Sequence, residues 1–166
     1  MMKKRVVTIA LVAVFGLLLE ATILAQFGTV RPDFLLLLTV TYGLLRGPWY
    51  GAGVGLCVGL FGDIFIGGVM GLGALAKTIT GFLVGLFEKV IFKDNLLIPL
   101  IAAFFGSMMA DGLFLLLRST LGWPAGSFLP LFARLALVAF YNALLAPFIY
   151  RPFYRFETRD AADLNK

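Results

Sequence analysis

The sequence predicts an all-α, polytopic membrane protein that folds as one bundle of six transmembrane helices. Hydrophobic residues make up 61% of the 166 residues and charged residues only 14%, whereas soluble domains are about half apolar and a quarter charged. The apolar residues also form long runs that alternate with short polar segments. Such runs are typical of helices that cross a bilayer one after another. A chain of this length is expected to form a single domain.

The first helix is predicted at about residues 6–27, directly after the basic residues 3–5. A positive start followed by an apolar run is also typical of a signal peptide, and the small residues between Ala21 and Ala25 would suit a cleavage site. The apolar run is nevertheless long enough to span a bilayer. We therefore favour an uncleaved helix.

The second helix is predicted at about residues 32–45. Pro32 suits a first helical position, and Asp33 complements the positive end of the helix dipole. The segment gives only about 20 Å of helix, which is short of a hydrocarbon core of about 30 Å. A snorkelling Arg46, a locally thinner bilayer or a re-entrant path would each accommodate this length, and the charge distribution favours a span.

Four more helices are predicted at about residues 49–66, 72–92, 96–117 and 128–150. Each is a long apolar run, and segments that contain glycine, proline or charged residues separate them. The remaining residues, 151–166, form a tail that is basic and aromatic at first and polar at its end. We expect this tail to lie on anionic lipid headgroups at the cytoplasmic face. Contact with a cytoplasmic partner is the alternative.

The positively charged residues predict that both termini are cytoplasmic, because cytoplasmic loops have an excess of lysine and arginine. With six spans and the N-terminus inside, the outer loops hold only Arg31 and Arg118. If the second helix did not cross the membrane, this asymmetry would disappear. The inner segments then hold Lys3, Lys4, Arg5, Arg46, Lys89, Lys93, Arg151, Arg155, Arg159 and Lys166.

Five ionisable residues fall inside the predicted spans, where a charge is unfavourable unless it is buried with a partner. Counting 1.5 Å per residue from the predicted helix ends places all of them about 4–10 Å below the outer surface. They would form one polar layer shared by five helices. These residues are Glu20, Asp63, Lys77, Asp111 and Arg134.

The hypothesis for this layer is two ion pairs, Asp63 with Lys77 and Asp111 with Arg134, each between the two helices of a hairpin. Glu20 is left to find another partner. In one interpretation these pairs only hold the helices together. In the other, the layer lines an outward-facing pocket or docks a helix of another protein, because intramembrane charge is typical of functional sites.

Glycines recur every four residues in the third and fourth predicted helices. A spacing of four places them on one ridge of a helix, and small residues allow helices in a membrane to approach closely. We expect these ridges to pack helices together rather than to bind a ligand. The residues are Gly51, Gly55, Gly59, Gly73, Gly81 and Gly85.

The residue types argue against several classes of function. The chain has no histidine, which removes the commonest general base and metal ligand, and it has no phosphate-binding loop. Its single cysteine, Cys57, lies in an apolar run. The net charge of +5 does not indicate a nucleic-acid partner, because the cations lie at the ends of spans. We expect no enzymatic activity, no cofactor and no bound metal.

Four short motifs, taken in order, resemble one protein family. They are Pro32-Asp33 before a leucine-rich helix, Leu45-Arg46-Gly47-Pro48, Gly62-Asp63-Ile64-Phe65 and Gly71-Leu72-Gly73-Ala74-Leu75. With the six-helix layout over about residues 1–155, the chain resembles the MreD family of bacterial rod shape-determining membrane proteins. The positions that support the resemblance are Pro32, Asp33, Arg46, Gly47, Gly62, Asp63, Gly71 and Leu72.

The resemblance implies a non-enzymatic scaffold of the bacterial inner membrane. Such a scaffold belongs to the cell-wall elongation complex, or elongasome, and helps to maintain rod cell shape and peptidoglycan synthesis. The implied direct partner is MreC, through its transmembrane helix and the adjacent periplasmic segment. MreB, RodA and a class B penicillin-binding transpeptidase would be indirect partners. Membrane lipids would also be bound, and self-association into a homo-oligomer stays open.

The MreD family also resembles the S-components of energy-coupling-factor transporters, which are six-helix bundles with binding sites that open outward. That resemblance implies the same fold and an alternative function. In this alternative, the charged layer would bind a vitamin or another polar small molecule. We favour the scaffold because the outer loops lack a strong ligand signature.

Overall fold

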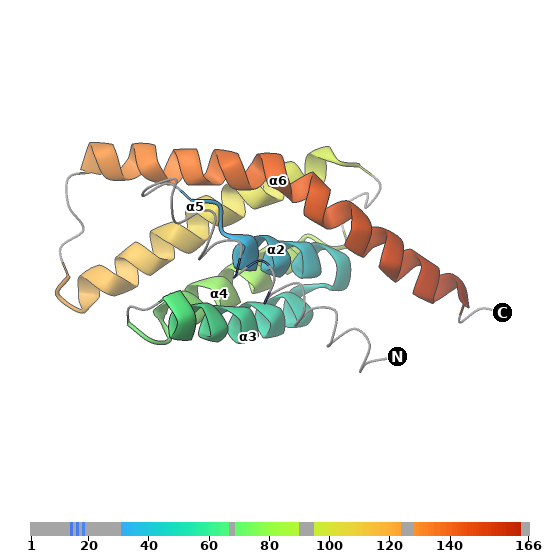
Figure 1. Ribbon diagram of the computed structural model, residues 1–166, viewed down its shortest axis with the longest axis horizontal. Helices are drawn as coiled ribbons and strands as arrows, with labels where there is room; N and C mark the ends of the chain where they lie inside the picture. Colours follow the sequence, from blue (N-terminus) through green and yellow to red (C-terminus); the bar gives the residue numbers. More distant parts are fainter. Residues whose placement is uncertain are drawn as a thin grey trace.

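A computed structural model describes residues 14, 16, 18, 31–66, 69–89, 95–123 and 128–163 (Figure 1). Within these residues all regular structure is helical, which confirms the predicted all-α class for this part of the chain. The first predicted helix and Glu20 lie outside the described residues, apart from residues 14, 16 and 18, which are helical. The helices are α2 (Phe34–Arg46), α3 (Pro48–Ile66), α4 (Leu72–Leu86), α5 (Leu97–Thr120) and α6 (Phe128–Asp163).

Among the described residues, two helices are long and apolar enough to cross a membrane on their own. They are α5, over Leu97–Thr120, and α6, over Leu129–Thr158. The apolar helices α2 and α4 are shorter. The count of six spans therefore stays a prediction.

The short helix α2 forms the centre of the bundle. Every residue from Leu35 to Leu45 is buried, and α2 packs against α3, α4, α5 and α6. Figure 1 shows it between α6 on one side and the α3–α4 pair on the other. A helix that is apolar on all sides is expected inside a bundle rather than on its surface. Its neighbours therefore explain how a helix of 13 residues is accommodated.

The helices α3 and α4 pack against each other through their backbones. A Cβ atom added at Gly51 would collide with the carbonyl oxygen of Gly81, and one added at Gly55 would lie 2.5 Å from the carbonyl oxygen of Lys77. The same construction at Gly59 meets the Cα of Ala74. Glycine is thus the residue that fits at each of these crossings.

The ends of three helices differ from the predicted ones. The helix α4 ends at Leu86 instead of about residue 92, and α5 continues to Thr120 instead of about 117. The helix α6 continues far beyond residue 150 and ends at Asp163, with Pro147 and Pro152 inside it. Proline inside a helix removes one backbone hydrogen bond and bends the helix, and Figure 1 shows α6 changing direction part-way along its length.

Packing explains why the helix continues through this proline-containing part of α6. Tyr150 and Phe153 lie one turn apart and are only 1% and 7% exposed. Their rings are held against the bundle, so the helical geometry is stabilised by tertiary contacts that the sequence pattern does not display. The predicted tail is therefore an extension of α6 as far as Asp163.

Candidate functional site

A pocket of about 180 Å³ lies at the end of the bundle where α2 and α4 begin and α3 ends. We call this end the pocket end and the opposite one the Arg46 end. The pocket brings together three of the five charged residues that the sequence placed in one layer. It is lined by Leu35, Gly62, Asp63, Gly73, Ala76, Lys77, Ala110, Asp111 and Phe114.

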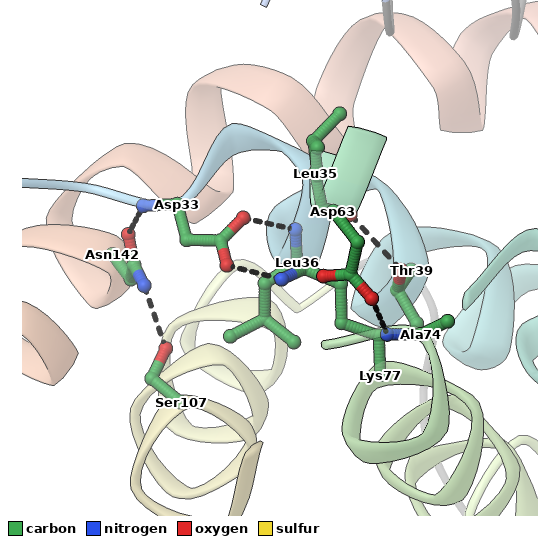
Figure 2. A network of polar contacts seen from close by, with 9 residues as sticks. All are labelled: Asp33, Leu35, Leu36, Thr39, Asp63, Ala74, Lys77, Ser107 and Asn142. Carbon is green, nitrogen blue, oxygen red and sulfur yellow. Dashed lines mark hydrogen bonds and ion pairs between the residues drawn. The ribbon is translucent and has the colours of Figure 1, made fainter. Parts of the chain in front are cut away.

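Lys77 of α4 forms an ion pair with Asp33, the residue directly before α2. The Lys77 Nζ atom lies 2.7 Å from Asp33 Oδ2, and both side chains are largely buried. The other oxygen, Asp33 Oδ1, accepts a hydrogen bond of 2.7 Å from the backbone N–H of Leu36. Asp33 thus caps the N-terminus of α2 and neutralises a lysine of α4 with one carboxylate (Figure 2).

The carboxylate of Asp63 is bound by the first turn of α4 instead of by Lys77. Its Oδ2 atom accepts hydrogen bonds from the backbone N–H groups of Gly71, at 2.8 Å, and Ala74, at 3.1 Å. The first N–H groups of a helix have no partner within the helix, so they attract a carboxylate strongly. The structure thereby replaces the predicted Asp63–Lys77 pair by the Asp33–Lys77 pair.

Two glycines make this capping geometry accessible. Gly71 has a φ of +96°, in the left-handed region that favours glycine. A Cβ atom at Gly73 would collide with the Asp63 carboxylate. The Gly71-Leu72-Gly73 sequence is therefore matched to the carboxylate that it surrounds.

A second polar chain joins the start of α2 to α5 and α6. The Asp33 N–H donates to Asn142 Oδ1 at 2.9 Å, and Asn142 Nδ2 donates to Ser107 Oγ at 2.8 Å. Asn142 and Ser107 are both fully buried. Figure 2 shows this chain on one side of Asp33 and Lys77 on the other. Sequence reasoning did not single out Asn142, although an asparagine within an apolar helix is a signal for a buried polar partner.

The charged groups around Asp111 differ from the predicted ones. Within the described residues it forms no ion pair with Arg134, whose side chain is exposed. Among the described residues, the charged groups near enough to act on Asp111 are Asp33, Lys77 and Arg134. The reason is the placement of α6: Asn142 lies level with Asp33, so Arg134 lies eight residues, or about 12 Å, farther along the helix.

Comparison with known proteins gives one family match. The chain matches the family model described as rod shape-determining protein MreD over residues 2–157. The chain belongs to the MreD family. Searches of curated proteins and of solved structures each found no match, so the likeness to energy-coupling-factor S-components stays a prediction.

The residues that suggested the MreD family occupy both ends of the bundle. Asp63, Gly71 and Leu72 form the capped turn at the pocket end. At the Arg46 end, Gly47 follows α2 with a φ of +89°, and the Arg46 guanidinium donates to Glu157 at 2.5 Å. Pro32 precedes the Asp33 cap, and a Cβ atom at Gly62 would lie 2.8 Å from Leu35.

The chemistry of the pocket in this MreD-family protein is that of an acidic, partly apolar recess. Lys77 neutralises one carboxylate, and Asp63 is satisfied by backbone amides. Asp111 adds a further carboxylate to a wall that includes Leu35 and Phe114. Such a recess suits a hydrogen-bond donor or a cation. Among the described residues, no group of three or more His, Cys, Asp or Glu side chains is arranged to hold a metal ion.

Proposed function

We propose that this protein is a non-enzymatic scaffold of the bacterial inner membrane that binds MreC within the cell-wall elongation complex. In this role it helps to maintain rod cell shape and peptidoglycan synthesis. The observation that supports the proposal most is the family match, which covers residues 2–157 and therefore nearly the whole chain. MreB, RodA and a class B penicillin-binding transpeptidase are proposed as indirect partners through MreC.

The proposed orientation has six spans, both termini in the cytoplasm and the pocket end toward the periplasm. The described cations at the Arg46 end support it: Arg46 ends α2, Lys89 follows α4, and Arg151 and Arg155 lie in the C-terminal part of α6. A clustering of lysine and arginine is typical of the cytoplasmic side. In this orientation the acidic pocket faces the compartment in which MreC has its large domain.

Two surfaces suit the two proposed contacts of MreC. The helices α5 and α6 expose large apolar side chains, among them Ile101, Phe105, Phe140 and Leu144, and these can pack against lipid or against a transmembrane helix. The pocket offers Asp111 to donor groups of the periplasmic segment that follows this helix. We therefore assign the apolar faces to the helix of MreC and the pocket to the adjacent segment.

Loss of the gene tests the scaffold function directly. A rod-shaped host that lacks this protein is expected to become round and to recover when the wild-type chain is expressed. Tagged MreC is expected to co-purify with the chain from native membranes. Normal rods and normal wall synthesis in the deletion strain would show that the protein has no such role.

Site-specific photo-crosslinking tests the two surfaces separately. Crosslinkers at Phe114 in the pocket and at Phe140 on α6 are expected to capture MreC, whereas one at Leu75, which is exposed on α4, serves as the comparison position. Strong capture from Leu75 and none from Phe114 would move the MreC contact away from the pocket. The gene-deletion result would not depend on this outcome.

The alternative function is vitamin binding as the S-component of a transporter, and the pocket is the observation that favours it. Its volume of about 180 Å³ is nevertheless below the ~300–1,000 Å³ of ordinary small-molecule sites, which supports the scaffold. Mass spectrometry of small molecules released from the purified protein separates the two. A stoichiometric vitamin would favour the alternative.

A further inference from the structure

The C-terminal part of α6 has two faces of different character. On one face Tyr150 and Phe153 are buried. On the opposite face Arg151, Arg155 and Phe156 are exposed, and Phe148, one turn earlier, is 78% exposed. We call the exposed set, Phe148, Arg151, Arg155 and Phe156, the arginine face.

The buried face is fixed to the end of α2. The ring of Phe153 packs edge-on against Tyr42 with 5.4 Å between their centroids. One turn farther along, Glu157 forms an ion pair of 2.5 Å with Arg46. This double contact determines the rotation of the helix about its axis, so it also determines where the arginine face points.

The arginine face has the composition of a headgroup-binding surface. Arg151 and Arg155 are four residues apart, so their side chains lie on neighbouring turns of one side of the helix. In the described part of the chain neither arginine forms an ion pair, while the aromatic residues Phe148 and Phe156 flank them. Basic side chains together with apolar ones such as phenylalanine are typical of helices at the boundary between hydrocarbon and headgroups.

The length of α6 places the arginine face at the depth of the lipid headgroups. The helix has 36 residues and is therefore about 54 Å long, whereas a hydrocarbon core is about 30 Å thick. If the apolar part starts at Leu129 near one surface, Arg151 and Arg155 lie about 33–39 Å along the helix. That position is within the headgroup layer of the opposite leaflet.

We propose that the arginine face binds the phosphate groups of anionic lipids. The inference goes beyond the proposed binding of MreC and depends on the proposed orientation only for the leaflet, which is the cytoplasmic one. Both guanidinium groups would donate hydrogen bonds to lipid phosphate oxygens, while Phe148 and Phe156 contact the upper part of the acyl chains. The fixed rotation of α6 makes the site largely pre-formed.

Lipid binding by the purified full-length chain tests this proposal without MreC. The chain is placed in phosphatidylcholine nanodiscs, phosphatidylglycerol is added in increasing proportion, and bound lipid is counted by native mass spectrometry. The double variant Arg151→Gln/Arg155→Gln is expected to bind phosphatidylglycerol about thirtyfold more weakly than the wild type, since each of the two cations near an anionic surface contributes about 1 kcal/mol. The preference is expected to fall at high salt.

Two variants control for charge and folding. The variant Arg151→Lys/Arg155→Lys keeps the charges and is expected to retain most of the binding. If substitution at these two positions disrupted folding, this variant would lose the binding as well. Arg118→Gln removes one cation at the pocket end and is expected to weaken phosphatidylglycerol binding much less than the double glutamine variant does. Equal binding by the wild type and the glutamine variant would overturn the proposal. If that variant bound lipid normally but failed to restore rod shape, the arginine face would be a protein contact instead.

Discussion

Asp33 is the residue on which the most elements of the bundle depend. Its carboxylate caps α2 and pairs with Lys77 of α4, and its backbone N–H donates to Asn142 of α6. A largely buried charged pair is stable only while both partners are present, because removal of one leaves the other without its nearest opposite charge. The two residues are therefore expected to behave as a unit.

Removal of either partner is expected to destabilise the protein strongly. Lys77→Met leaves the Asp33 carboxylate without its cation, and Asp33→Asn keeps the helix cap but removes the charge from Lys77's partner. Each is expected to lower the free energy of unfolding by about 3–5 kcal/mol. Reversible unfolding in detergent micelles or bicelles measures the effect.

The double variant Asp33→Asn/Lys77→Met is the decisive comparison. Its destabilisation is expected to be smaller than the sum of the two single effects, because neither member of the Asp33–Lys77 pair is left charged without the other. Lys89→Met, at an exposed lysine, is the control and is expected to change stability by less than about 0.5 kcal/mol. Strict additivity of the two single changes would contradict the ion pair.

At the scale of helices, the α3–α4 hairpin is organised by backbone contact. Gly51 and Gly81 face each other, and a methyl group on either would meet the carbonyl group of the other. Backbone atoms cannot rotate away as a flexible side chain can, so the two helices would have to separate. The packing between them is therefore sensitive to one added carbon atom.

Gly81→Ala is expected to destabilise the protein by about 1–3 kcal/mol through this overpacking. Gly53→Ala is the matched control on the same hairpin, because a Cβ atom there meets nothing within 4 Å. Alanine favours the helix by up to about 1 kcal/mol relative to glycine, so the control is expected to be neutral or stabilising. Thermal unfolding in detergent compares the two, and equal effects would show that the hairpin is not closely packed at Gly81.

The extension of α6 is expected to depend on the Arg46–Glu157 ion pair. Glu157→Gln removes the charge that fixes the extension to α2, and partly exposed pairs contribute up to about 1 kcal/mol. Local opening of the extension is then expected to increase about fivefold. Hydrogen exchange of a peptide that covers residues 150–163 measures this opening.

Thr158→Ala is a suitable control for that experiment, because its hydroxyl group bonds only to carbonyl groups of the same helix in the described structure. Its exchange rate is expected to match the wild type. Unchanged exchange in Glu157→Gln would mean that the packing of Phe153 against Tyr42 is sufficient to hold the extension.

For the whole molecule, the sequence predicted the helices well where a change in polarity or a helix breaker marks the end. Asp33 and Gly47 delimit α2, and Gly71 precedes α4, so these boundaries agree within two residues. The end of α6 could not be predicted in this way. Its continuation through Pro147 and Pro152 depends on contacts with α2, which lies more than a hundred residues earlier in the chain.

The sequence placed three charged residues of the pocket at one depth but did not predict how they pair. Asp63, Lys77 and Asp111 do line one pocket, because depth counting needs only the positions of helix ends. To predict which residues pair, one also needs to know how far each helix is shifted along its axis relative to its neighbours. The start of α2 lies level with Asn142 in the middle of α6, so Asp33 reaches Lys77 while Arg134 lies farther out. The short length of α2 was the available signal that Asp33 is not at the surface.

The central position of α2 also has a consequence for the order of biogenesis. At about 20 Å, α2 is too short to cross a bilayer unaided, and each of the helices that enclose it in the described structure is synthesised after it. The contacts of Asp33 with Lys77 and Asn142, and of Tyr42 with Phe153, can form only after α4 and α6 have been made. The segment is therefore expected to reach its final depth only after α6 has left the ribosome. One of the first helices to be made would then be the last to take its final position in the bundle.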